Sequence, residues 1–311
     1  MRIKNAFKIL ISNSVVIYKA MFYKLITSSL IALLAYFVVA KDIRYIFGQP
    51  EVNAFWNSII TTFSEFFKGN PLNKDLIPEA FDAILVMLKD NLATITLASM
   101  KIGIFLLLLN VVERMGNYAI GILTNGYMSS LSKYSLVASL LANIGKSFLY
   151  SIIIVPLAFV FDGLILLIAV LIGVYGIRVI SVFAIILALM FVVIALSCKF
   201  TIISRFMPTM ITEKKSATEA FKTCFTKREK FLHMVGNYAF VIMISFYLNV
   251  SVAVFTLGAG LIVALPLTSI FTIIVSFVDT YQLSGKKYYV SGEEVVTPRQ
   301  MREHADLLKY M

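Results

Sequence analysis

The sequence predicts an all-α fold, namely a polytopic membrane helix bundle of about six transmembrane helices with both termini in the cytoplasm. Two observations carry this prediction. Apolar residues make up 59% of the 311-residue chain and charged residues only 14%, with a mean hydropathy of +0.88, whereas soluble proteins are about a quarter charged. Six apolar runs are each about long enough to cross the hydrocarbon core of a bilayer.

Charge predicts the sidedness. The segment 199–235 carries eight Lys/Arg against three Glu, and such segments stay on the cytoplasmic side. That placement puts 21 Lys/Arg inside and six outside. The net charge of +11 then reflects basic loops facing an anionic inner leaflet, and nucleic acid is not needed to explain it.

The first elements follow from local pattern. Residues 1–21 alternate apolar and basic positions at helical spacing, which predicts an amphipathic helix at the inner interface. Residues 22–40 form the first span. Residues 41–91 carry five Lys/Arg and seven acids, as expected of an extracytoplasmic loop. Within this loop the periodicity predicts two short helices, 52–67 and 78–88, separated by the breaker residues 68–71.

The second span is predicted at 92–112, with Lys101 near its centre. Residues 115–146 have few charges and several glycines, so they form either an interface-bound helix or a re-entrant piece covered by protein. The remaining spans are predicted at 147–171, 179–198, 236–256 and 261–281. A turn at Gly173–Gly176 joins the third span to the fourth.

The cytoplasmic parts are the connector 199–235 and the tail 282–311. Ser216 lies three residues before Glu219, which predicts a capping box at the start of an amphipathic basic helix. The tail is expected to hold a small hairpin around Ser291–Gly292, then a helix capped by Thr297. The two cysteines, Cys198 and Cys224, lie near the connector, where a reducing compartment implies no disulfide.

One part of the connector has a recognisable pattern. It contains Arg205-Phe-x-Pro, Ile211-Thr-Glu213 and Ala220-Phe-Lys222 before a basic run and an apolar span. This order resembles a broad group of poorly characterised bacterial integral membrane proteins with six helices. The group includes the membrane domain found with some glycerophosphodiester phosphodiesterases. The resemblance implies a bacterial cell-membrane protein, and no phosphodiesterase domain accompanies it here.

Lys101 and Asp162 fall near the centres of neighbouring predicted spans. An unpaired charge there costs several kcal/mol, so the two side chains are expected to face the bundle interior and pair. The pair has two interpretations, a structural ion pair or part of an ion or proton path.

The basic surfaces are the other candidates for binding. Several lysines near an anionic leaflet would hold a helix to the membrane, bind a lipid headgroup or dock an acidic partner. The candidate residues are Lys214, Lys215, Lys222, Lys227, Arg228, Lys230, Lys286 and Lys287.

Residue types that mark enzymes do not form recognisable patterns. His233 and His304 lack metal-site spacing, and the chain has no phosphate-binding glycine loop, so no catalytic residue, metal or cofactor is expected. Asp75, Glu79 and Asp82 are interpreted as a solvated helix face. The expected function is therefore non-enzymatic: a scaffold, sensor or accessory subunit with a membrane or cytosolic protein partner. The alternative is a small-solute or ion/proton-coupled transporter that uses Lys101 and Asp162.

Overall fold

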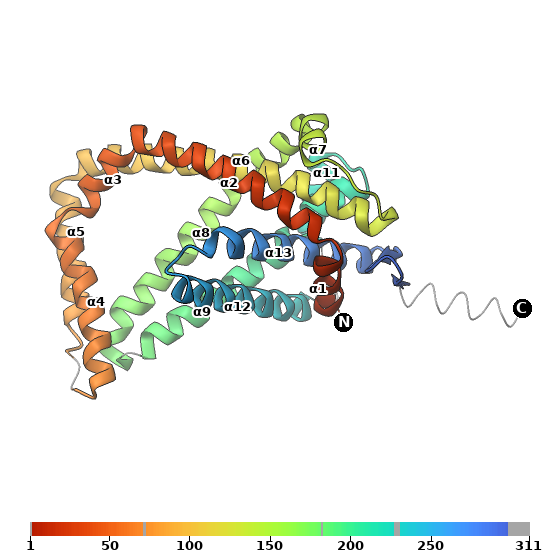
Figure 1. The fold of residues 1–311 in the computed structure, drawn as a ribbon. Helices are drawn as coiled ribbons and strands as arrows, with labels where there is room; N and C mark the ends of the chain where they lie inside the picture. The colour runs from red at the N-terminus through yellow and green to blue at the C-terminus, as the bar shows by residue number, and fades with distance from the viewer. Residues whose placement is uncertain (1, 71–72, 182, 227–230, 298–311) are drawn as a thin grey trace, which may run out of the picture. The chain divides into compact units, whose positions relative to one another are not determined.

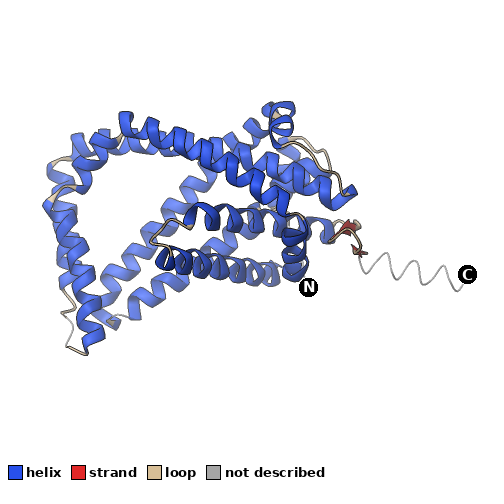
Figure 2. Ribbon diagram, in the orientation of Figure 1, coloured by secondary structure: helices blue, strands red, loops and turns tan. Residues whose placement is uncertain are grey.

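A computed structural model describes residues 2–70, 73–181, 183–226 and 231–297. These residues are mostly helical and include one two-stranded hairpin (Figure 2). In chain order the elements are α1 (Arg2–Ser12), α2 (Ser14–Val38), α3 (Ala40–Phe47), α4 (Pro50–Lys68), α5 (Leu76–Asp90), α6 (Leu92–Ser130), α7 (Leu136–Ala142), α8 (Ile144–Ile180), α9 (Phe183–Ile203), α10 (Phe206–Thr212), α11 (Ala217–Cys224), α12 (Phe231–Phe255), α13 (Leu261–Leu283), β1 (Tyr288–Tyr289) and β2 (Val295–Val296) (Figure 1).

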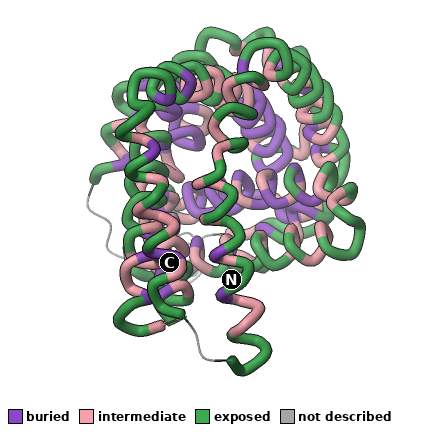
Figure 3. Tube along the Cα trace, turned by 90° about the vertical axis from the view of Figure 1, so that its left-hand side faces the viewer, coloured by how far each residue is buried: buried purple, intermediate pink, exposed green. Residues whose placement is uncertain are grey.

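Long apolar helices confirm the predicted all-α class, while the sidedness of the termini stays a prediction. Within the described residues, six are long and apolar enough to span a membrane: α2, α6, α8, α9 extended through α10, α12 and α13. Exposed residues cover much of the helical trace and buried residues occupy shorter stretches (Figure 3). Many of the exposed side chains are large and apolar, which suits helices that face lipid. The chain is therefore a multi-pass membrane protein by helix length and composition.

The chain divides into two compact units. Unit 1 comprises Met1–Ser28, Asn110–Val155 and Ser197–Met311, and unit 2 comprises Ser29–Leu109 and Pro156–Leu196. Both are built from segments distant in sequence, because α2, α6, α8 and α9 each contribute to both units.

Unit 1 is organised around α13. The apolar window of this helix is 61% buried, compared with 11% for α12, and α1, α10 and α12 all pack against it. A row of aromatic rings continues this core, with centroids 5.1 to 5.7 Å apart. The row consists of Tyr118, Tyr150, Phe206, Phe221 and Phe225. It links α6, α8, α10 and α11 by burying large apolar rings edge to face or tilted.

Unit 2 has its own small core. Ile77, Val174, Ile177 and Ala184 are buried together, with Phe55 and Phe81 packed against them. The two predicted loop helices are thus present as α4 and α5, which pack against each other and against the adjoining ends of α8 and α9. Asp75 pairs with Arg178 at 3.0 Å and Asp82 accepts a hydrogen bond from Tyr175 at 3.1 Å. Asp75 and Glu79 are exposed, as predicted for a solvated face, while Asp75 and Asp82 each also contact a residue of α8.

The N-terminal region differs from the single helix expected over residues 1–21. The first helix ends at Ser12, and α2 begins at Ser14 and runs without a break into the first apolar run. Beyond α2, the structure adds α3, a helix of eight residues that the pattern of 41–91 did not predict.

The region 115–146 also differs from the prediction. Helix α6 continues past Val112 to Ser130, so the first half of this region is continuous with the second predicted span and is not a separate helix. Gly116 lies within α6, and a Cβ at this position would overlap the ring of Tyr23 on α2. The glycine permits close helix packing and does not break the helix.

A similar correction applies to the turn expected at Gly173–Gly176. Helix α8 passes through these residues and ends at Ile180, and the chain turns at Ser181, whose φ is 56°. A Cβ on Gly176 would lie 3.0 Å from the Cβ of Ala184 on α9. The glycine therefore lies in a tight helix contact, and the turn comes one helical turn later.

Candidate functional site

An ion pair joins α1, the first helix of the described chain, to α13, the last helix. Arg2 on α1 lies with Nη1 2.9 Å from Oδ1 of Asp279 on α13. The Asp279 side chain is 0% exposed and that of Arg2 is 15% exposed. Arg2 Nε also donates to Gln282 Oε1 at 2.9 Å. Two donors of one guanidinium thus engage neighbouring acceptors on the last turns of α13.

The hairpin extends this arrangement. The hydroxyl oxygen of Tyr288 on β1 accepts hydrogen bonds from Asn5 Nδ2 at 2.8 Å and from Gln282 Nε2 at 2.9 Å. Burial raises the pKa of Tyr288 above its ordinary value of 10.0. We name Arg2, Asn5, Asp279, Gln282 and Tyr288 the polar cluster. Asn5, Asp279 and Tyr288 are buried, Arg2 and Gln282 are partly buried, and their mutual hydrogen bonds join α1, α13 and the hairpin.

Sequence reasoning missed the polar cluster. By position Asp279 lies near the end of the predicted span 261–281, where a carboxylate can usually reach water, but its side chain is 0% exposed and Arg2 of α1 pairs with it. A signal was present in the sequence. An acid inside an apolar span needs a partner, and the first turn of the N-terminal helix offers an arginine.

The connector helix supplies the predicted capping box. Ser216 Oγ accepts from the backbone N–H of Glu219 at 3.3 Å, and Glu219 Oε2 accepts from the backbone N–H of Ser216 at 3.1 Å. These bonds hold the pKa of Glu219 below its ordinary value. Ala217, Ala220 and Cys224 are buried on the opposite side of α11. The capping box therefore sets which side chains of α11 face outward.

The exposed side of this region carries basic residues. Lys214, Lys222 and Lys287 are exposed, and Lys215 pairs with Glu213 at 2.7 Å. Lys286 Nζ donates to the backbone carbonyl of Thr212 at 3.2 Å, a favourable position for a cation at the end of α10. Lys227, Arg228 and Lys230, also predicted here, lie outside the described residues.

The Lys286 contact joins two sequence candidates into one surface. The connector lysines and the tail lysines are about 70 residues apart in the chain, and this hydrogen bond brings the two segments together. We name Lys214, Lys215, Lys222, Lys286 and Lys287 the basic surface.

The predicted charge pair in unit 2 is replaced by a different one. Lys101 Nζ lies 3.5 Å from Asp42 Oδ2 on α3, and its side chain is 49% exposed, while Asp162 is an exposed residue of α8. The length of α6 explains the change. At 39 residues it extends roughly 58 Å, about twice the hydrocarbon thickness, so Lys101 need not lie at the bilayer centre.

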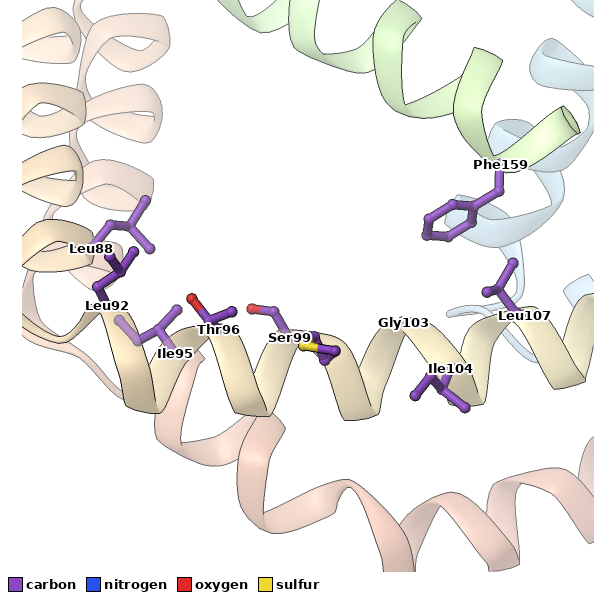
Figure 4. A pocket seen from close by; sticks show the side chains of 10 residues that line it. Leu88, Leu92, Ile95, Thr96, Ser99, Gly103, Ile104, Leu107 and Phe159 are labelled. Atoms are coloured by element: carbon purple, nitrogen blue, oxygen red, sulfur yellow. The ribbon is translucent and has the colours of Figure 1, made fainter. Parts of the chain in front are cut away.

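A pocket of about 550 Å³ runs along the same helix in unit 2 (Figure 4). Leu92, Ile95 and Leu107 of α6 and Phe159 of α8 line it, together with the hydroxyls of Thr96 and Ser99. Neither Lys101 nor Asp162 belongs to the lining. The pocket is therefore apolar, and the two charged residues that motivated the transporter hypothesis do not meet in it.

Among the described residues, no group of three or more His, Cys, Asp or Glu is arranged to hold a metal ion. No family model, curated protein or solved structure matches the chain.

Proposed function

We propose that this chain is a non-enzymatic membrane protein, a scaffold or accessory subunit that binds an acidic region of another protein through its basic surface. In this proposal both termini and the basic surface lie in the cytoplasm of a bacterial cell, and the protein resides in the cell membrane. The observation that carries the proposal is the hydrogen bond from Lys286 to Thr212, which unites the tail lysines with those of the connector.

The rigidity of the surface supports this function. The aromatic row and the buried side of α11 hold the connector against α10, while the polar cluster fixes the hairpin from the other side. Exposed lysines on a fixed support lose less conformational freedom when a partner binds than lysines on a loose loop.

The sidedness is tested with single cysteines in a chain lacking Cys198 and Cys224. Thr61 on α4 and Thr218 on α11 are both exposed, so Thr61→Cys and Thr218→Cys are matched reporters. A membrane-impermeant maleimide added to intact bacterial cells should label Thr61→Cys and spare Thr218→Cys. Labelling of Thr218→Cys in sealed cells contradicts the proposed orientation.

The partner is tested by photocrosslinking. A photoreactive amino acid at Thr218 should yield a discrete crosslinked protein in native membranes. Reversal of Lys214, Lys222 and Lys287 to Glu should abolish that adduct, whereas Lys68→Glu with Lys89→Glu, a charge reversal in unit 2, should leave it unchanged. The absence of any crosslinked protein argues against a docking function. An adduct that persists in the triple charge-reversal variant also argues against it.

A further inference from the structure

A groove in unit 1 lies between α1, α12 and α13. Its volume is about 400 Å³, within the range of small-ligand sites. Phe7 of α1, Leu248 of α12 and Phe271 of α13 are among the apolar residues that line it. Phe7 and Phe271 meet edge to face with their ring centroids 6.4 Å apart. By volume and lining the groove can receive a hydrocarbon chain, and it is too small for a whole lipid.

One side of the groove carries a positive charge. Helix α1 contains Arg2, Lys4 and Lys8 and no acid. Arg2 pairs with Asp279 and Lys8 with Glu294. Lys4 is exposed, lines the groove and forms no ion pair with the described residues. An anion at this edge would therefore meet an ammonium group that is not already neutralised.

We propose that this groove binds one acyl chain of an anionic phospholipid. The phosphate lies at Lys4 and the chain packs against Phe7, Leu248 and Phe271. Basic pockets between transmembrane helices on the cytoplasmic side recognise anionic headgroups in this way. The site is separate from the basic surface and does not depend on the proposed docking function.

The test uses brominated phospholipids, which quench nearby tryptophan. The only tryptophan of the chain is Trp56, so Trp56→Phe provides a silent background. Phe271→Trp places a reporter in the groove. Phe246→Trp is the control. Phe246 lies on α12, one of the helices that form the groove, but its side chain is 66% exposed and does not line the groove. Full-length variants are reconstituted with brominated phosphatidylglycerol or brominated phosphatidylcholine.

We expect phosphatidylglycerol to quench Phe271→Trp at a lower mole fraction than phosphatidylcholine, and both lipids to quench Phe246→Trp alike. Lys4→Gln should reduce the preference about fivefold, the effect of one lysine near an anionic headgroup, whereas Lys89→Gln should not. Native mass spectrometry of the unaltered chain gives a second readout, in which bound phosphatidylglycerol survives delipidation and is lost in Lys4→Gln. Equal quenching of the groove reporter by both lipids, or a preference that Lys4→Gln leaves intact, overturns the proposal.

Discussion

Arg2 and Asp279 are 277 residues apart in sequence and 2.9 Å apart in the structure. The carboxylate is fully buried and the guanidinium nearly so. Removing one member of a buried pair leaves an uncompensated charge and costs about 3–5 kcal/mol. Arg2→Gln should therefore lower the free energy of unfolding by about this amount, as measured by denaturation in detergent.

The double variant Arg2→Leu with Asp279→Leu separates the charge from the packing. Because it removes both ions, it should be more stable than Arg2→Leu alone or Asp279→Leu alone. A double variant as unstable as Arg2→Gln would mean that the specific geometry, and not the buried charge, determines the stability.

The stability of the folded chain should fall at alkaline pH because of Tyr288. Burial raises its pKa above 10.0, so the folded chain holds the phenolic proton more tightly than the unfolded chain does. The associated stability is fully present below pH 10.0 and is lost as pH rises through the higher folded pKa. The free energy of unfolding, measured by chemical denaturation in detergent, should therefore fall in that range. Tyr288→Phe, which cannot ionise, should remove this contribution to the pH dependence.

Gly176 should not tolerate a larger side chain. Its Cβ would lie 3.0 Å from that of Ala184, so Gly176→Val should destabilise the α8–α9 contact by about 1–3 kcal/mol through overpacking. Gly163→Ala is the control on the same helix, because a Cβ there meets nothing within 4 Å. Thermal unfolding in detergent should show a lower midpoint for the first variant and an unchanged or higher one for the second.

Lys101 should couple to Asp42 and not to Asp162. A double-mutant cycle with Lys101→Gln and Asp42→Asn should give a coupling energy of about 0.2–1 kcal/mol, the usual size for a partly exposed pair. The corresponding cycle with Asp162→Asn should give a value near zero. The opposite result would restore the pair expected from the sequence.

Thr209 offers a stabilising change. It is 1% exposed and its Oγ1 has no hydrogen-bond partner among the described residues, so Thr209→Val should leave stability unchanged or raise it by about 1 kcal/mol. The comparison is Thr280→Val, since the Thr280 hydroxyl donates to the backbone carbonyl of Ser276 at 2.9 Å. That variant should lose about 1 kcal/mol. A loss in Thr209→Val would point to a bonding partner for this hydroxyl.

Local chemistry explains which features could be predicted. The apolar runs, the α4–α5 pair and the capping box of Ser216 and Glu219 depend on neighbouring residues, so their patterns appear directly in the sequence. Gly176 was interpreted as a turn residue because glycine usually disfavours helix. Its true role depends on Ala184, which lies on another helix, just as the role of Gly116 depends on Tyr23.

The candidate sites show the same division. The lysines of the basic surface could be recognised from composition. That the tail lysines lie beside the connector lysines depends on the contact between Lys286 and Thr212. Likewise, the partner of Lys101 could not be read from span positions, because α3 and the full length of α6 were not evident. Contacts between distant segments are set by packing, which one sequence does not display.

The ion pair of Arg2 and Asp279 also orders events during synthesis. The carboxylate partner of Arg2 is added to the chain 277 residues after Arg2 itself. Helix α1 therefore cannot make its contacts with α13 until α13 has been synthesised and inserted.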